Sequence, residues 1–145
     1  MLILKVYYFE STLLILGGKN MVVKQLVGLT MDCKDIHLMA EFYNKLLGWE
    51  KLDMEESEEY SALRSQDGWI LSFQRVEKFV KPVWPWADGK QQQMVHFDFC
   101  VDNLEEAVKL ATELGATKSE KQYYDTTVVM FDPEGHPFCL MTETY

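Results

Sequence analysis

The order of the predicted elements is the feature that most constrains this fold. Residues 22–33 form a run of β-branched and apolar side chains, which is typical of a strand. A helix is then predicted from Asp35, a good N-cap residue, to Gly48, a residue that commonly ends helices. Three shorter strand-like runs follow it, at 49–54, 60–64 and 69–76.

The same order recurs in the second half of the chain. A strand at 94–101 leads into a helix that begins at Asn103 and ends at Gly115. Further strand-like runs lie at 119–124, 126–131 and 137–142. One helix on one small sheet is marginal alone, so the halves are expected to share a core. We predict an α+β chain of two βαβββ modules, about 21–77 and 91–145, that form a curved mixed sheet around a groove with the helices outside.

Two segments fall outside this repeat. Residues 78–90 hold two of the four prolines and two of the four tryptophans, and they are interpreted as a linker between the modules. Residues 1–20 form an N-terminal extension with two interpretations, an extra hairpin or translated leader sequence. We favour the leader, because Gly17-Gly18-Lys19 shortly before Met21 is what a purine-rich ribosome-binding site encodes when it is read in frame.

Charge and cysteine content narrow the partners and the compartment. The formal net charge is −9 and no cluster of Lys or Arg stands out, so neither nucleic acid nor a membrane surface is an expected partner. The three cysteines are odd in number and lack a CxxC motif, which favours a reducing compartment and a cytoplasmic protein. No apolar run approaches the ~18 residues that are needed to span a bilayer.

The predicted strand at 94–101 carries the residues of greatest chemical interest. It alternates strictly, with Val95, Phe97, Phe99 and Val101 on an apolar face and Met94, His96, Asp98 and Cys100 on the other. An imidazole, a carboxylate and a thiol on one face are unusual if that face only meets water. We expect this face to line the groove between the modules.

Four segments together resemble the vicinal oxygen chelate superfamily, and most closely its glyoxalase-like branch: DIHLMAEFYNKLLGWE, VWPWADGKQQQ, HFDFCVDNLEEAVKLATELGAT and DPEGHPFCL. That superfamily includes glyoxalase I, extradiol dioxygenases, fosfomycin-modifying enzymes and bleomycin-resistance proteins. The resemblance covers residues 21–142. It implies paired βαβββ modules and a homodimer.

In metal-dependent members of the superfamily, four side chains from four strands hold one divalent ion. The matching positions in this chain are Gly28, Gln74, His96 and Cys139. One of them has no side chain, one is a neutral amide and one is a thiol, which is a poor set for a divalent cation. No cofactor is therefore expected, and a divalent metal is the less favoured alternative. The same departures argue against glyoxalase I and extradiol dioxygenase activity.

Other residues allow two interpretations each. Trp84 and Trp86 could form an aromatic wall around a ligand, or they could pack at a module junction or dimer interface, which we favour. Asp98 could orient the imidazole of His96 or be a carboxylate at the rim of the groove. Cys139 could be an activated thiolate, but we favour an ordinary buried thiol. Three further residues are predicted to have no functional role: Cys100 as a packed thiol, and His37 and His136 as solvent-facing side chains.

The favoured function is the binding of a small organic ligand in the groove between the modules, with His96 and Gln74 as polar contacts. One alternative is a drug-sequestering binder like the bleomycin-resistance proteins. The other is a metal- or His96-dependent lyase, isomerase or transferase. Whether the chain is an enzyme is left open at this point.

Overall fold

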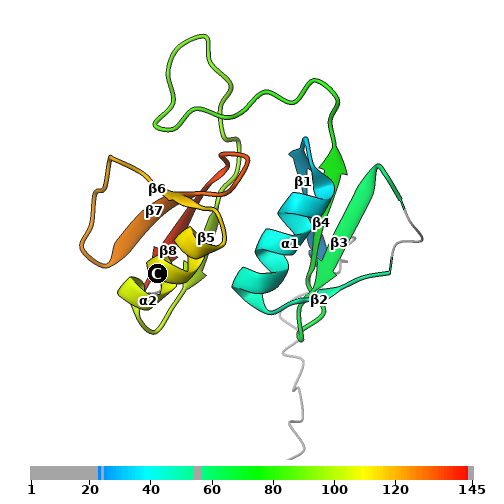
Figure 1. Ribbon diagram of the computed structural model, residues 1–145, viewed down its shortest axis with the longest axis horizontal. Coiled ribbons are helices and arrows are strands. Elements are labelled where there is room, and N and C mark those ends of the chain that lie inside the picture. Colours follow the sequence, from blue (N-terminus) through cyan, green and yellow to red (C-terminus); the bar gives the residue numbers. More distant parts are fainter. Residues whose placement is uncertain (1–22, 24, 54–56, 144–145) are drawn as a thin grey trace, which may run out of the picture.

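The computed structural model describes residues 23, 25–53 and 57–143 and consists of two modules that lie side by side (Figure 1). The first contains β1 (Gly28–Cys33), α1 (Ile36–Leu47), β2 (Glu50–Lys51), β3 (Tyr60–Arg64) and β4 (Ile70–Arg75). The second contains β5 (Phe97–Cys100), α2 (Leu104–Glu113), β6 (Thr117–Lys118), β7 (Thr127–Phe131) and β8 (Pro137–Met141). The predicted α+β class and the repeated βαβββ order are confirmed.

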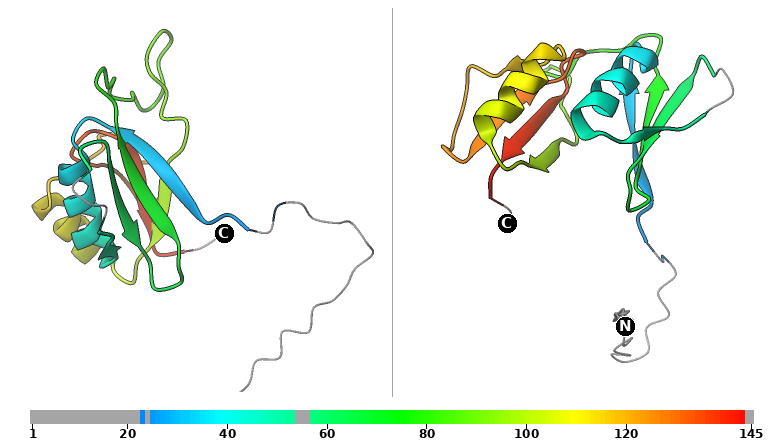
Figure 2. Two further views of the ribbon diagram at one scale, coloured as in Figure 1. Left: turned by 90° about the vertical axis from the view of Figure 1, so that its right-hand side faces the viewer. Right: turned by 60° about the horizontal axis from the view of Figure 1, so that its bottom comes forward.

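Each module has one four-stranded mixed sheet. The strand orders are β1-β4-β3-β2 and β5-β8-β7-β6, with β1 parallel to β4 and β5 parallel to β8. The two helices lie on the same side of the two sheets, and the linker rises over one end of both modules (Figures 1 and 2). Within the described residues the strand pairing divides the strands into two sheets, so β1 and β5 are each edge strands.

The predicted helix ends coincide with capping interactions. Asp35 Oδ1 accepts hydrogen bonds from the backbone N–H groups of His37 and Leu38, at 3.0 and 2.9 Å. Gly48 has the left-handed φ of 66° and its N–H donates to Asn44 O, which ends α1. Neither helix in the described ranges is long and apolar enough to cross a membrane.

The core lies between the helices and the sheets and is shared by both modules. Tyr43 of α1 lies at its centre with no exposed surface. Its ring stacks on Phe73 of the first sheet, with ring centroids 5.7 Å apart. The ring also packs against Phe97 and Phe99 of the second sheet, with centroid separations of 5.9 and 6.4 Å. The shared core buries a larger fraction of apolar surface than either module could bury alone, which offsets the marginal stability expected of a single module.

The strand predicted at 94–101 is shorter than expected. Met94 has a φ of 61°, which is incompatible with a strand, and β5 begins only at Phe97. The side chain of Val95 is 62% exposed, so its predicted place on the apolar face is wrong. Phe97, Phe99 and Val101 do pack against the core as predicted.

Two other segments can be compared with the sequence analysis. The linker at 78–90 contains no strand, as predicted, whereas residues 119–124 form no extended strand and make one isolated bridge, Tyr124 to Thr127. The N-terminal extension at 1–20 lies outside the described residues, so both of its interpretations stay open.

Candidate functional site

A cavity of about 420 Å³ opens on the second sheet, on the face that points away from the helices. Asp98 and Cys139 lie on this face because they alternate with Phe97, Phe99 and Phe138, which pack into the core. The cavity is lined by Trp84 of the linker and by ten residues of the second module: His96, Asp98, Tyr123, Tyr124, Thr126, Thr127, Val129, Cys139, Met141 and Glu143.

Three predicted site residues converge at this cavity. Asp98 and Cys139 are direct neighbours across the parallel β5–β8 pair, and His96 lies two residues before Asp98. The distance from His96 Nε2 to Asp98 Oδ1 is 3.3 Å, and ligand atoms of all three residues lie within 4.8 Å of one another. Asp98 is therefore a direct partner of His96, whereas the sequence left its role undecided.

The environment of Cys139 favours the protonated form of its thiol. Burial raises its pKa from 9.0 to about 12, and the hydrogen bond and negative charge of Asp98 add to that effect. A nucleophilic cysteine needs the opposite, a neighbouring cation or base that lowers the thiol pKa. The surroundings of Cys139 thus support the favoured interpretation over an activated thiolate.

One of the two linker tryptophans forms part of the cavity wall. Trp84 meets Tyr123 edge to face, with ring centroids 5.8 Å apart, and also contacts Phe131 at 6.4 Å. Trp86 is 68% exposed and is not among the residues that line the cavity. Trp84 therefore packs against the second module, in line with the favoured interpretation, and it also lines the cavity, whereas Trp86 does not line it.

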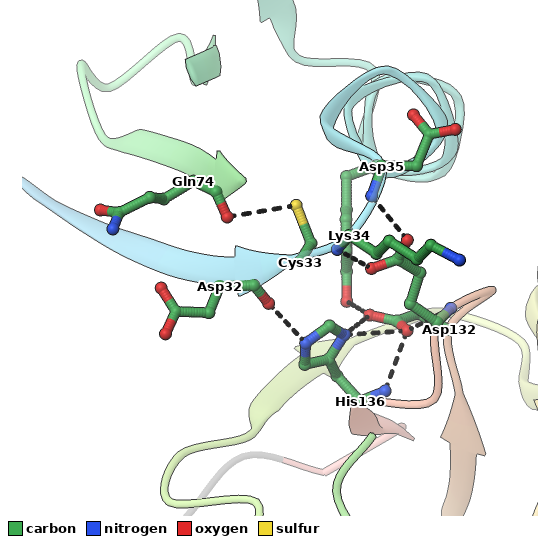
Figure 3. Close-up of polar contacts among 9 residues, drawn as sticks. Asp32, Cys33, Lys34, Asp35, Gln74, Asp132 and His136 are labelled. Atoms are coloured by element: carbon green, nitrogen blue, oxygen red, sulfur yellow. Dashed lines mark hydrogen bonds and ion pairs between the residues drawn. The ribbon is translucent and has the colours of Figure 1, made fainter. Parts of the chain in front are cut away.

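Gly28 and Gln74 lie apart from the three converging residues. Gln74 belongs to β4 in the other sheet, where its backbone oxygen accepts from Cys33 Sγ at 3.6 Å (Figure 3). Gly28 pairs with Ile70, and a Cβ at Gly28 would lie 2.5 Å from the backbone oxygen of Ile70. The strand pairing therefore leaves no room for a side chain at Gly28 unless the backbone shifts.

These positions do not fit the metal site that the resemblance implies. Such a site needs ligands from both modules around one ion, yet Gly28 offers none and Gln74 does not line the cavity of His96 and Cys139. The amide of Gln74 would also be a weak ligand for a divalent cation. No step of a metal-dependent reaction is therefore derived from these four positions.

A second cavity, of about 410 Å³, lies between the modules. Residues 29–32 of β1 line one side of it, and the segment 91–97 lines the other. His96 lines both cavities. Gln93, which lines the second cavity, forms a hydrogen bond with its imidazole: Gln93 Nε2 lies 3.2 Å from His96 Nδ1. His136 also lines this cavity.

His136 is part of a polar network that joins the modules (Figure 3). Its Nδ1 lies 2.9 Å from Asp132 Oδ2, and its Nε2 lies 2.8 Å from the backbone oxygen of Asp32. Tyr43 donates its hydroxyl to the same Asp132 carboxylate at 3.1 Å. The prediction that His136 is solvent-facing is wrong, because its side chain is only 13% exposed.

The predictions for His37 and Cys100, which were also expected to have no functional role, have different outcomes. His37 is exposed on α1, as predicted. Cys100 is exposed, so its predicted role as a packed thiol is wrong. It faces the same side of the sheet as Asp98, near the open end of the strand, where no helix covers it.

Tyr123, Tyr124 and Glu143 line the cavity but are not among the residues predicted from the sequence. Both tyrosines lie in the irregular segment before β7, at 60% and 74% exposure. Two adjacent exposed tyrosines indicate a binding surface, because large aromatic side chains that lie together on a protein surface often mark an interaction site.

Comparisons with known proteins agree with this architecture. Residues 28–141 match the family described as the glyoxalase-like domain. No curated protein matches the chain. Among solved structures, a glyoxalase family protein from Enterococcus faecalis is 23% identical, with a TM-score of 0.59 over 81% of this chain and 97% of that one. The fosfomycin resistance protein FosX from Mesorhizobium loti is 15% identical, with a TM-score of 0.63 over 84% and 94%.

A third solved structure is a glyoxalase/bleomycin resistance/dioxygenase family enzyme from Burkholderia phytofirmans. It is 18% identical, with a TM-score of 0.60 over 79% of this chain and 94% of that one. At these identities the structures support the shared fold and not a shared activity. The matched family covers both modules from β1 to β8, so this chain belongs to the glyoxalase-like domain family.

Proposed function

We propose that this chain binds a small organic cation, such as a protonated aromatic amine, in the cavity of the second module. One observation carries the proposal: aromatic rings and carboxylates share the cavity, and the described residues that line it include neither Lys nor Arg. The rings are those of Trp84, Tyr123 and Tyr124, and the carboxylates are those of Asp98 and Glu143.

The chemistry of these groups favours a cation with an apolar body. An aromatic face attracts a cation through its quadrupole, by about 0.5–2 kcal/mol depending on solvent exposure. A carboxylate adds a charge-assisted hydrogen bond to an ammonium N–H. The net charge of −9 on the whole chain would further raise the local concentration of cations around it.

Membership of the family supports a small organic molecule as the ligand class. Solved proteins of similar fold include fosfomycin resistance proteins and a glyoxalase/bleomycin resistance/dioxygenase family enzyme. The raised pKa of the Cys139 thiol supports binding over nucleophilic catalysis through Cys139.

Titration calorimetry with paired probes tests the proposal. Each aromatic amine is compared with its neutral N-acetyl analogue, in the presence of EDTA so that metals play no part. We expect the amines to bind and the neutral analogues to bind at least about tenfold more weakly, which corresponds to about 1.4 kcal/mol. Trp84→Ala should weaken amine binding by about tenfold, since it removes a cation–π partner.

Trp86→Ala is the matched control, because Trp86 belongs to the same linker but does not line the cavity. It should leave the amine affinity unchanged. Equal affinity for the amine and its neutral analogue, or an equal loss in the two tryptophan variants, would contradict the proposal.

A further inference from the structure

We propose that His96, Asp98 and Cys139 form a three-ligand site for Zn²⁺ or a similar thiophilic divalent cation, held within the second module alone. This site goes beyond the organic ligand proposed above. It also differs from the four-position set, because it uses Asp98, draws on one sheet and requires nothing from Gly28 or Gln74.

The separations of the three side chains suit a single ion. Metal–ligand bonds of about 2.0–2.2 Å to nitrogen and oxygen place these two atoms roughly 3.4 Å apart around a tetrahedral ion. His96 Nε2 and Asp98 Oδ1 are 3.3 Å apart. One ligand atom from each of the three residues, with Cys139 Sγ as the third, lies within 4.8 Å of the other two, so side-chain adjustment alone would have to close the remaining gap around one ion.

The backbone already fixes two of the three ligands. Asp98 and Cys139 occupy directly paired positions of β5 and β8, so their spacing is set by the sheet rather than by a loop. Sites built on strands hold their side chains more precisely than sites built on loops. The site therefore needs only side-chain adjustment.

A partner outside the cluster can orient the imidazole of His96. Metal-bound histidines usually donate their second ring N–H to an acceptor. Gln93 contacts His96 Nδ1, and Gln93 Oε1 is buried without a hydrogen-bond partner within the described structure. A half-turn of the Gln93 amide would bring this oxygen to accept from Nδ1–H, which leaves the Nε2 lone pair facing the cluster.

The donor types select the metal. One nitrogen, one carboxylate oxygen and one thiolate sulfur are ligands of Zn²⁺, whereas Mg²⁺ and Mn²⁺ prefer sites made of oxygens. The two anionic ligands would offset the charge of the ion, and the thiol of Cys139 would release its proton when it bound the metal. The side chains of His96 and Asp98 are 39% and 29% exposed, so an ion can reach them from solvent.

Metal binding to the EDTA-treated full chain tests this site. After dialysis against Zn²⁺, elemental analysis should find one equivalent per chain. Co²⁺ should give a thiolate-to-metal charge-transfer band, which reports a cobalt–sulfur bond directly. Cys139→Ser should abolish that band, and His96→Ala should weaken Zn²⁺ binding by more than about 100-fold, beyond the effect of losing an outer partner.

Cys100→Ser and His37→Ala are the matched controls, since both residues are exposed and lie outside the cluster. Both should retain the wild-type affinity and spectrum. The proposal is overturned if Cys100→Ser loses the band, if Cys139→Ser keeps it, or if Mg²⁺ binds as tightly as Zn²⁺. The probe is the metal alone, so failure of amine binding in EDTA leaves this result unaffected.

Discussion

His136 and Asp132 form a largely buried ion pair at the junction of the modules, with His136 Nδ1 2.9 Å from Asp132 Oδ2. The second ring nitrogen faces the backbone oxygen of Asp32 at 2.8 Å. Both nitrogens therefore face acceptors, and only the doubly protonated ring can donate to both of them. The geometry favours the imidazolium form at this position.

The ion pair makes stability depend on pH. Burial alone lowers the pKa of His136, but the hydrogen bond and charge of Asp132, helped by the Asp32 carbonyl and by Glu134, raise it above its ordinary 6.5. A raised pKa means that the stabilisation is complete below pH 6.5 and is lost as the pH rises through the higher folded pKa. We expect the free energy of unfolding, measured in urea, to fall across that window.

His136→Gln should remove this pH dependence and destabilise the chain by about 1–3 kcal/mol below the window, where the charged hydrogen bonds are intact. The matched control is His37→Gln on the exposed face of α1, which should keep the wild-type pH profile. If His136→Gln retains the full slope, the imidazolium is not its origin.

Tyr43→Phe should destabilise the chain while leaving its core filled. The substitution removes only the hydroxyl that donates to Asp132 at 3.1 Å, and the burial of this contact makes the loss cost about 1–2 kcal/mol. Thermal denaturation measures the change. Tyr60→Phe, at a tyrosine that is 45% exposed, should change the midpoint little; equal effects of the two would show that the Asp132 contact contributes nothing.

The three cysteines should differ in reactivity. Burial is the main cause that raises the pKa of Cys33 and of Cys139 to about 12, whereas Cys100 is exposed. At about pH 8.5 iodoacetamide should label the exposed Cys100 and leave the other two largely unmodified. Peptide mass spectrometry reads the labelling at each site. Rapid modification of Cys139 would contradict this expectation and support its interpretation as an activated thiolate.

Gly28→Ala should destabilise the first module. Its Cβ would lie 2.5 Å from the backbone oxygen of Ile70, and a backbone shift in the β1–β4 pair costs about 1–3 kcal/mol. For the same reason, Gly28→His should not raise Zn²⁺ affinity. A stable Gly28→His protein that binds Zn²⁺ more tightly would show that a metal site shared by the two modules can form.

Zn²⁺ and an organic cation should compete. Both proposals use the negative charge of Asp98, and a bound ion would neutralise it and replace the proton of Cys139. Saturation with Zn²⁺ should therefore weaken aromatic-amine binding by at least about tenfold in the calorimeter, as expected for loss of one charged contact. Unchanged amine affinity in Zn²⁺-loaded protein would place the two ligands in separate parts of the cavity.

The parts of the fold that could be predicted from the sequence are those set by local interactions. Asp35 and Gly48 mark α1 correctly because a cap is an interaction between residues a few positions apart. The segment 60–64 coincides with β3 for a similar reason, since turn residues bound it on both sides. The left-handed conformation of Met94 has no comparable signal in the local sequence, so the predicted strand begins earlier than the observed β5.

The site was harder to predict because its contacts are long-range. The imidazole of His136 forms a hydrogen bond with the backbone oxygen of Asp32, a residue of the other module. The sequence around His136 gives no indication of this partner. The convergence of Asp98 with Cys139 depends on the register of β5 against β8, which a single sequence does not fix. His96 could be identified because the family motif places it, independently of that register.

The place of Tyr43 in the core has a consequence for how the chain unfolds. One ring from α1 packs on Phe73 of the first sheet and on Phe97 and Phe99 of the second. Neither sheet can lose its order without exposing the same side chain, so the two modules should melt as one cooperative unit. The duplicated architecture is then expected to unfold as a single cooperative unit, and an isolated half is expected to lack the packing that stabilises the whole.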